Sequence, residues 1–266
     1  MNGTSRRAFV FGPETMFVDT AKSSAGMLVL GGTREERLHK VILPNLSGRS
    51  FILYDPDGSE CAELSESLIS EGWNTVRIEN PASLVKRTLC EMFGEKTVMF
   101  ICVKNRKEAL SVYRAIDAMI YEAFIVCFGS QNGWSSQCGL DIVFDGFNSL
   151  ALSEDAGKNP VTRLIRRCGL WSGSVMISLD AMEEVYAYGG GAELDILANC
   201  PVKVCFKTDE ERANRYFSKW HCAEEKKGML GRKKTVPGGD AVPGNLNDGE
   251  AILLLPDSPY ARIVRV

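Results

Sequence analysis

The apolar residues of the chain fall into short continuous runs, separated by longer stretches of mixed polarity. Runs this short, bounded by glycine, proline or polar residues, are typical of strands buried on both faces of a sheet. They lie at residues 27–30, 50–54, 75–78, 97–103, 124–128, 140–144, 174–178 and 202–206. Apolar residues at helical spacing lie between them, at 35–43, 61–71, 82–94, 107–122 and 160–168. Alternating strands and helices predict an α/β fold with a mainly parallel sheet.

The two ends of the chain have weaker patterns. Residues 8–11 and 16–18 are predicted as short edge strands, and residues 251–255 and 262–266 as a closing hairpin. Residues 223–249 hold lysines, glycines and prolines with almost no apolar periodicity. Such a composition does not bury enough surface to offset the entropy lost on ordering. We therefore predict an exposed mobile loop over 223–249.

The turn after the first core strand is the main candidate for a binding site. Gly31 and Gly32 follow the apolar run 27–30 and precede the predicted helix. Strand, glycine turn and helix are the layout of a phosphate-binding loop, and ligands of parallel sheets bind beyond the carboxyl ends of the strands.

The chemistry of a P-loop is missing from this turn. The motif G-x-x-x-x-G-K-[ST] needs a glycine for close approach of the backbone, a lysine for the phosphates and a hydroxyl for Mg²⁺. Counted from Gly31, those places hold Glu36, Arg37 and Leu38. Glu36 brings a negative charge to the place of the phosphate oxygens, and Leu38 has no metal ligand.

Carboxylates explain how such a turn folds without an anion. Glu35 and Glu36 lie in the first turn of the predicted helix, where they satisfy free N–H groups and the positive end of the dipole. On these residues alone, an ordinary strand–helix turn with an acidic first turn is the alternative interpretation.

Motifs on either side of the turn resemble a known family. The run Val29-Leu-Gly-Gly-Thr33 is followed by Leu43-Pro44-Asn45-Leu46 and by Asp55-Pro56-Asp57-Gly58-Ser59-Glu60. These segments resemble GGTGSGKT, IPNLL and DPKGE of the TraG-type conjugative coupling proteins, which are type IV secretion DNA-translocating ATPases of the FtsK/HerA class. The resemblance implies a three-layer P-loop NTPase, RecA-like fold, with Gly31, Gly32 and Thr33 in the phosphate loop.

The resemblance continues downstream and covers most of 27–219. Residues 77–81 (RIENP) and 196–206 match further family segments, and residues 140–147 have the Walker B layout. By the resemblance, Asp145 is the former Mg²⁺ anchor and Gly146 replaces the glutamate that polarises the attacking water. Asp145 as a plain strand-end residue is an equal alternative. Ser178 stands where the family has a glutamine that senses the nucleotide.

The length of the chain suits the nucleotide-binding domain alone. Coupling proteins usually carry N-terminal membrane helices and an all-helical domain, and the 266 residues leave space for neither. We therefore expect residues 1–266 to form a single RecA-like nucleotide-binding-type domain.

Composition narrows the function classes further. The net charge is −3 with 45% hydrophobic residues, which is neither a disordered protein nor a generally basic nucleic-acid binder. The nine cysteines include no C-x-x-C spacing and there are two histidines, so no disulfide framework and no metal site is expected. Since no apolar run approaches the ~20 residues of a membrane span, a cytoplasmic protein is expected.

The substitutions at Glu36, Arg37, Leu38 and Gly146 predict a domain that has lost ATP hydrolysis. Its expected role is scaffold or assembly work in conjugative DNA transfer or type IV secretion, with protein partners of that machinery, as a homo- or hetero-oligomer and with no cofactor. One alternative is an ATPase with a non-standard loop that uses Arg37 and Asp145 and binds ATP with Mg²⁺. Another is a nucleic-acid-binding accessory module, whose possible polyanion contacts are Lys226, Lys227, Arg232, Lys233 and Lys234.

Overall fold

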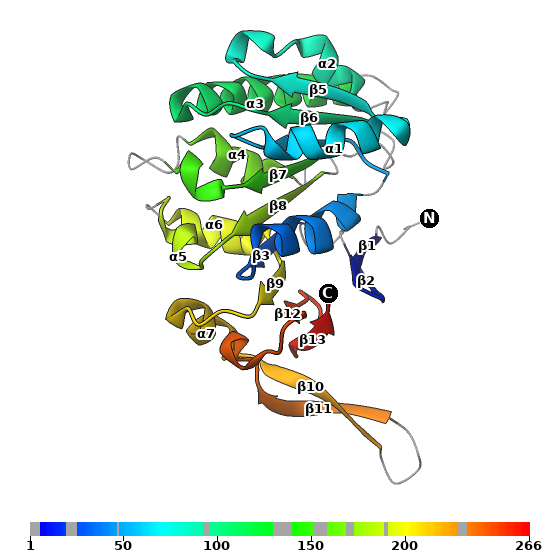
Figure 1. Cartoon of the computed structure of the whole chain (residues 1–266), viewed down its shortest axis with the longest axis vertical. Coiled ribbons are helices and arrows are strands. Elements are labelled where there is room, and N and C mark those ends of the chain that lie inside the picture. The colour runs from blue at the N-terminus through cyan, green and yellow to red at the C-terminus, as the bar shows by residue number, and fades with distance from the viewer. Residues whose placement is uncertain are drawn as a thin grey trace.

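A computed structural model of the chain describes residues 6–19, 26–46, 48–92, 96–129, 140–151, 159–168, 173–188, 191–227 and 233–266. Over these residues the centre of the molecule is a nine-stranded sheet in the order β13-β12-β9-β3-β8-β7-β4-β6-β5 (Figure 1). The strands from β3 to β9 pair in parallel, and β12 and β13 are added antiparallel beyond β9. The predicted α/β fold with a mainly parallel sheet is confirmed.

The central strands are buried along their whole length. The parallel strands are β3 (Met27–Leu30), β4 (Phe51–Tyr54), β5 (Asn74–Ile78), β6 (Thr97–Ile101), β7 (Asp141–Asp145), β8 (Ser174–Leu179) and β9 (Val202–Phe206). All except the edge strand β5 have every residue buried, as strands covered on both faces require. The antiparallel pair is β12 (Glu250–Leu254) and β13 (Arg262–Arg265), so the predicted closing hairpin is present.

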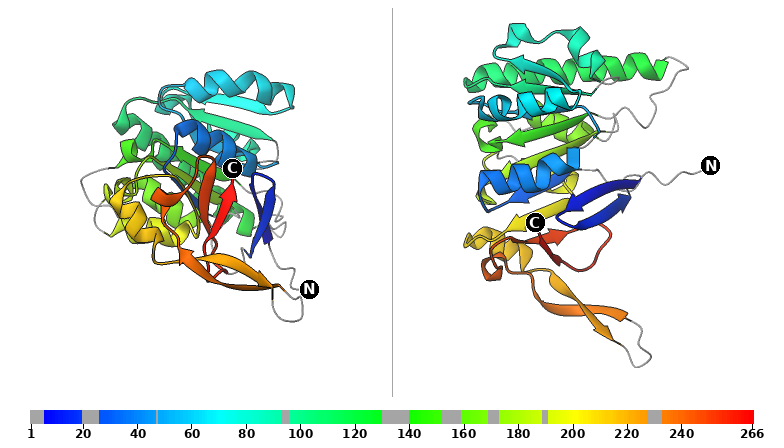
Figure 2. Two further views of the ribbon diagram at one scale, coloured as in Figure 1. Left: turned by 60° about the horizontal axis from the view of Figure 1, so that its bottom comes forward. Right: turned by 45° about the vertical axis from the view of Figure 1, so that its right-hand side comes forward.

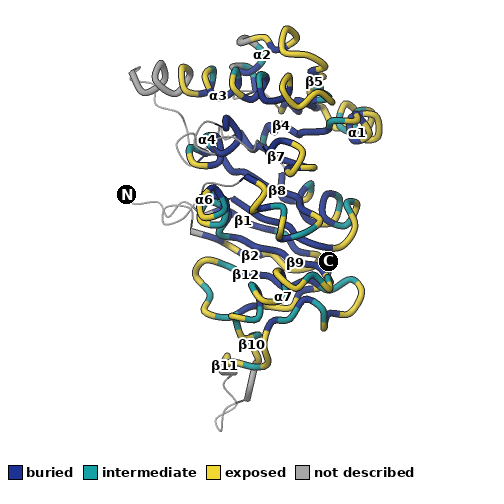
Figure 3. The backbone as a smooth tube through the Cα atoms, turned by 90° about the vertical axis from the view of Figure 1, so that its left-hand side faces the viewer, coloured by how far each residue is buried: buried dark blue, intermediate teal, exposed yellow. Residues whose placement is uncertain are grey.

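Alternate residues of each strand enter two separate hydrophobic cores, which gives three layers. Leu28 and Leu30 of β3 face one core, and Met27 and Val29 face the other. The first core is covered by α2 (Lys86–Glu91), α3 (Arg106–Gly129), α4 (Pro160–Arg167), α5 (Glu183–Tyr186), α6 (Ala192–Asn199) and α7 (Glu211–Phe217). The second is covered by the π-helix η1 (Glu36–Ile42), the 3₁₀ turn η2 (Leu43–Leu46), α1 (Ser59–Ser70) and the hairpin of β1 (Arg6–Phe11) with β2 (Glu14–Asp19). Figures 2 and 3 show the buried sheet between these outer layers.

A buried ion pair fastens the β1–β2 hairpin to the amino end of the parallel sheet. The Arg7 guanidinium donates to both carboxylate oxygens of Asp141, at 3.1 and 2.8 Å, and Asp141 is fully buried. Burial alone would raise the pKa of Asp141, but the charges of Arg7 and Arg49 and the hydrogen bonds from Arg7 and Ser174 hold that pKa below its ordinary value. Asn45 completes the attachment, because its amide bonds both the N–H and the C=O of Val10.

Two predicted elements are wrong. Residues 124–128 are not a strand but the end of α3, because a short apolar run fits a buried helix as well as a strand. The segment 223–249, predicted as a loop, contains most of an antiparallel ribbon of β10 (His221–Lys227) and β11 (Lys233–Asp240), which extends from the body in Figure 1. The base of the ribbon is bonded to the body of the protein, because the Ala223 N–H donates to the Ala261 carbonyl at 2.8 Å and the Ala261 N–H donates to the His221 carbonyl at 2.9 Å. The two strands pair through backbone hydrogen bonds, which leave no apolar periodicity in the sequence. Residues 228–232 lie outside the described part.

Replacing Arg7 by leucine should lower the free energy of unfolding by about 3–5 kcal/mol, because the buried Asp141 loses the guanidinium that hydrogen-bonds both of its oxygens, while Arg49 lies 3.8 Å away. Chemical denaturation at neutral pH measures this loss. The control is Arg77→Leu, which removes an exposed arginine paired with Glu79 and should change stability by at most ~1 kcal/mol. Equal losses in the two variants would contradict the account.

Stability of the wild-type protein should fall in acid. Because the folded-state pKa of Asp141 is lowered, its stabilising contribution is complete above the unfolded pKa of about 3.9 and is lost as pH falls through the folded value. The stability difference between the wild-type protein and Arg7→Leu should therefore narrow below about pH 4. A difference that stays constant down to pH 2 would contradict the ion pair as its cause.

Candidate functional site

The glycine turn lies at the carboxyl end of β3 and has the backbone of a tight loop. Gly31 and Gly32 have φ of +67° and +61°, in the left-handed region that favours glycine. A Cβ on Gly31 would lie 3.1 Å from the carbonyl oxygen of Phe206, so the neighbouring strand also leaves little room for a side chain. The turn therefore keeps the strand–loop–helix path of a phosphate-binding loop.

Glu36 occupies the free donors at the start of η1. Its Oε2 accepts a hydrogen bond from the Thr33 N–H at 3.0 Å, and its own N–H donates to the Thr33 hydroxyl at 3.1 Å. This reciprocal pair is a capping box. The hydrogen bond from the Thr33 backbone is also the main reason why the pKa of Glu36 lies below its ordinary value. A carboxylate of the chain itself thus holds a donor that a phosphate would use.

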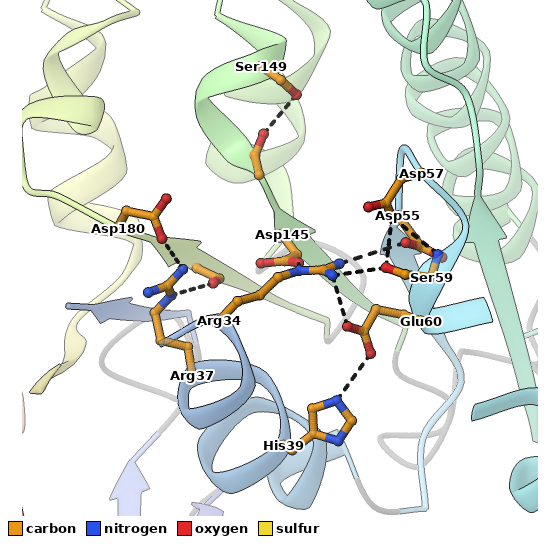
Figure 4. A network of polar contacts seen from close by, with 12 residues as sticks. Arg34, Arg37, His39, Asp55, Asp57, Ser59, Glu60, Asp145, Ser149 and Asp180 are labelled. Carbon is orange, nitrogen blue, oxygen red and sulfur yellow. Dashed lines mark hydrogen bonds and ion pairs between the residues drawn. The ribbon is translucent and has the colours of Figure 1, made fainter. Parts of the chain in front are cut away.

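Arg37, in the lysine position of the motif, lies beneath the loop. Its side chain is 3% exposed. It donates to the carbonyl oxygens of Gly31 and Gly32 at 3.0 and 2.9 Å, to the Ser178 hydroxyl at 2.9 Å and to the Asp180 carboxylate. Its donors are therefore engaged with the loop and with the end of β8 (Figure 4).

The Arg34 guanidinium lies among carboxylates from the carboxyl ends of β4 and β7 and from the first turn of α1. It is hydrogen-bonded to Asp145 and to the Ser59 hydroxyl, and its Nη1 lies 3.2 Å from Oε1 of Glu60. Asp55 Oδ1 lies 3.7 Å from Arg34 Nη2. Figure 4 shows the guanidinium between Asp145 on one side and Ser59 and Glu60 on the other. Arg34 was not predicted from the sequence as a site residue, although the family loop GGTGSGKT, aligned with GGTREERL of this chain, has a glycine at this position.

The carboxylates around Arg34 are short of compensating charge. Burial raises the pKa of both Asp55 and Glu60 above the ordinary values. Asp55 is fully buried, and its Oδ1 accepts no hydrogen bond from the residues that the structure describes. Arg34 thus lies next to both buried carboxylates, and His39 is a further partner of Glu60.

The segment predicted as Walker B contains a glycine with a left-handed backbone. Asp145 ends β7 and is 3% exposed, within reach of Arg34. Gly146 follows with φ +70° and begins the 3₁₀ turn η4 (Phe147–Leu150). A Cβ on Gly146 would meet no atom within 4 Å, but the left-handed backbone disfavours a glutamate there.

The structure brings most of the predicted site residues to one edge of the sheet. Gly31, Gly32, Thr33, Glu36, Arg37, Asp145, Gly146 and Ser178 lie at the carboxyl ends of β3, β7 and β8. Leu38 does not join them, because it is fully buried in the second core. The lysines of the β10–β11 ribbon form a separate group, and Arg232 lies outside the described residues.

Comparison with known proteins gives structural similarity only. No protein-family model matches the chain, and no curated protein matches its sequence. The conjugative coupling protein TrwBdeltaN70 superposes with a TM-score of 0.60 at 12% identity, over 100% of this chain and 89% of the other. The genome packaging NTPase B204 of Sulfolobus turreted icosahedral virus 2 gives 0.53 at 10% identity, over 91% and 96%. The fold is that of a P-loop NTPase.

A third similar structure comprises ATPases 2 and 3 of EccC from Thermomonospora curvata, with a TM-score of 0.52 at 13% identity. It is matched over 99% of this chain but only 40% of the other. Identities this low show the shared fold and leave activity open. Among the described helices, none has the length and apolar character needed to span a bilayer.

Replacing Glu36 by alanine should lower the free energy of unfolding by about 1 kcal/mol, because the capping box is lost. The matched control is Glu35→Ala, since the neighbouring Glu35 makes no capping hydrogen bond through its side chain. Thermal melts of both variants, with and without sulfate, measure the effect. Sulfate should stabilise Glu36→Ala more than the wild-type protein; equal stabilisation would contradict competition between Glu36 and an anion.

Proposed function

We propose that this protein is a non-hydrolysing member of the P-loop NTPase fold that serves as a scaffold or assembly subunit of a DNA-transfer or secretion machinery. The observation that carries the proposal is the Arg34 guanidinium, which lies on Asp145 and Glu60 inside the region where a nucleotide and its metal would bind. The folded domain would then need no bound MgATP.

Four side chains at the loop oppose nucleotide binding, either through their charge or because they lack a ligand for the metal. Arg34 occupies the carboxylates with which a P-loop enzyme would hold Mg²⁺, and Leu38 offers no hydroxyl for that ion. The Glu36 carboxylate accepts the hydrogen bond of the Thr33 N–H, so its negative charge lies where it would repel phosphate oxygens. Arg37 donates to the loop carbonyls and does not face an incoming phosphate.

The residue that would assist hydrolysis directly is also replaced. Gly146 stands in place of the glutamate that would polarise the attacking water. Loss of one well-placed electrostatic catalyst commonly lowers the rate by ~10²–10³-fold. The alternative of an ATPase that uses Arg37 and Asp145 is disfavoured because both side chains are engaged within the protein.

The biological setting of the proposal comes from the similar structures. Their names describe a conjugative coupling protein, a genome packaging NTPase, and the cytoplasmic domain of EssC. A subunit with this fold and an internally neutralised site suits pairing with an active homologue or with other components of such a machinery, in the cytoplasm.

Polyanion binding by the β10–β11 ribbon is a second candidate function. The register pairs Lys226 with Lys234 and Lys227 with Lys233. Like charges directly opposite one another destabilise a strand pair, so an anionic partner would relieve a cost that the ribbon otherwise carries.

MgATP at submillimolar concentration should leave the melting temperature of the wild-type protein unchanged. A variant with Arg34→Gly, Glu36→Gly, Arg37→Lys and Leu38→Thr, checked for folding by circular dichroism, should be stabilised, by ~2.7 kcal/mol at 100 times its Kd. The matched control is Arg34→Gly alone. Because it retains Glu36, its melting temperature should not rise with MgATP.

An upward shift of the wild-type melt with MgATP would refute the proposal. A folded quadruple variant that does not bind would mean that more than these side chains closes the site. Even when binding is restored, hydrolysis should still require Gly146→Glu, and measurable turnover without it would contradict the assigned role of position 146.

Single-stranded DNA should bind the wild-type protein with an affinity that falls as salt rises, by a slope of about −0.7 per phosphate neutralised. Lys226→Gln with Lys227→Gln should weaken binding and reduce that slope. The control pair, Lys104→Gln with Lys107→Gln, removes two exposed lysines outside the ribbon and should have no effect. Equal effects of the two pairs would rule out a specific contact of the ribbon.

A further inference from the structure

A histidine and two glutamates converge beside the Arg34 site, on the outer layer formed by η1 and α1. His39 Nε2 lies 3.2 Å from Oε2 of Glu60 and 3.9 Å from Oε1 of Glu63. All three ligand atoms lie within 4.8 Å of one another. Figure 4 shows His39 directed at Glu60, on the side away from Arg34.

The spacing of these atoms fits a single metal ion. With metal–ligand bonds of about 2.1 Å, two ligands on one ion lie about 3.0 to 3.4 Å apart in octahedral or tetrahedral geometry. The separation of His39 and Glu60 falls inside this interval. Glu63 is 66% exposed, so its side chain is free to close the remaining distance by a change of rotamer.

The donors also suit the chemistry of a borderline divalent ion. Imidazole nitrogen and carboxylate oxygen are ligands of Zn²⁺ and its first-row neighbours. Glu60 is 5% exposed; one of its oxygens faces Arg34 and the other faces His39. This buried carboxylate is held in place from both sides, so the ligand set is largely formed before an ion arrives.

We propose that His39 Nε2, Glu60 Oε2 and Glu63 Oε1 form a site for a divalent transition-metal ion such as Zn²⁺, completed by water. Binding at Nε2 requires the neutral imidazole with its proton on Nδ1, together with ionised carboxylates on Glu60 and Glu63. This differs from the expectation from sequence that the chain holds no metal site, because no sequence pattern indicates that His39 lies next to α1.

The site would strengthen the link between two elements that already meet in the second core and through the His39–Glu60 contact. His39 comes from η1, whereas Glu60 and Glu63 lie three residues apart on α1. An ion between them links the helix after the glycine turn to the helix after β4. Glu60 is shared with Arg34, so the ion also fixes one of the carboxylates on which Arg34 depends.

Calorimetric titration of Zn²⁺ into the reduced, full-length protein tests the proposal. One ion should bind per chain and raise the melting temperature. His39→Asn and Glu63→Gln should each weaken the affinity at least tenfold and abolish most of the thermal shift.

Two matched controls keep the test specific. His221→Asn removes the other histidine, which also pairs with a carboxylate, that of Asp240 at 3.0 Å. Glu66→Gln removes an exposed glutamate one turn further along α1. Both variants should bind Zn²⁺ as the wild-type protein does.

Co²⁺ provides a second measurement, because the chain also holds free cysteines. Binding at His39, Glu60 and Glu63 predicts d–d absorption without a thiolate charge-transfer band, and His39→Asn should remove it. The proposal is overturned if the wild-type protein does not bind, if folded His39→Asn binds equally well, or if Co²⁺ shows thiolate ligation.

Discussion

Carboxylates buried at the end of a parallel sheet require a cation, and in this protein the guanidinium of Arg34 supplies it. Asp145 ends β7 and Asp55 follows β4, so the sheet itself brings these two acids together. Glu60 joins them from the first turn of α1. In a P-loop enzyme the bound Mg²⁺ compensates the negative charge of a carboxylate at this edge of the sheet. In this protein a guanidinium three residues after Gly31 takes that place.

Two further interactions follow from this arrangement. Arg34 lies where a metal ion would otherwise face these carboxylates, and the Glu36 carboxylate takes up the Thr33 N–H that would otherwise face an anion. Arg37 holds the loop carbonyls from beneath and ties them to Ser178. At the opposite end of β7 the same principle applies, since Asp141 depends on Arg7. Each buried acid of this strand is thus paired with an arginine from outside the sheet.

The sequence predicted the strands and the loop that surround the site better than the side-chain interactions within it. Short apolar runs and the glycine pair located the parallel strands and the loop, because burial and left-handed backbone leave strong local signals. Arg34 was missed because its partners, Asp55 and Asp145, are distant in sequence and only the sheet order brings them together. The same holds for His39 with Glu60.

The remaining errors concern segments whose residues have no distinctive hydrophobic period or whose backbone conformation the sequence does not reveal. The run 124–128 is apolar without a distinctive period, and only its continuity with α3 identifies it as helix. The β10–β11 ribbon is stabilised by backbone pairing between polar residues, so its two strands carried no hydrophobic signal. By the resemblance, Gly146 was predicted to replace a glutamate; its left-handed backbone is visible only in the structure.

The most direct test of the central claim is a crystal structure of the wild-type protein grown with millimolar Mg²⁺ and a non-hydrolysable ATP analogue. The account predicts the Arg34 guanidinium on Asp145 and Glu60, the Glu36 carboxylate on the Thr33 N–H, and no nucleotide on the loop. Phosphates bound at Gly31–Thr33, with Arg34 displaced from Asp145 and Mg²⁺ in its place, would contradict it.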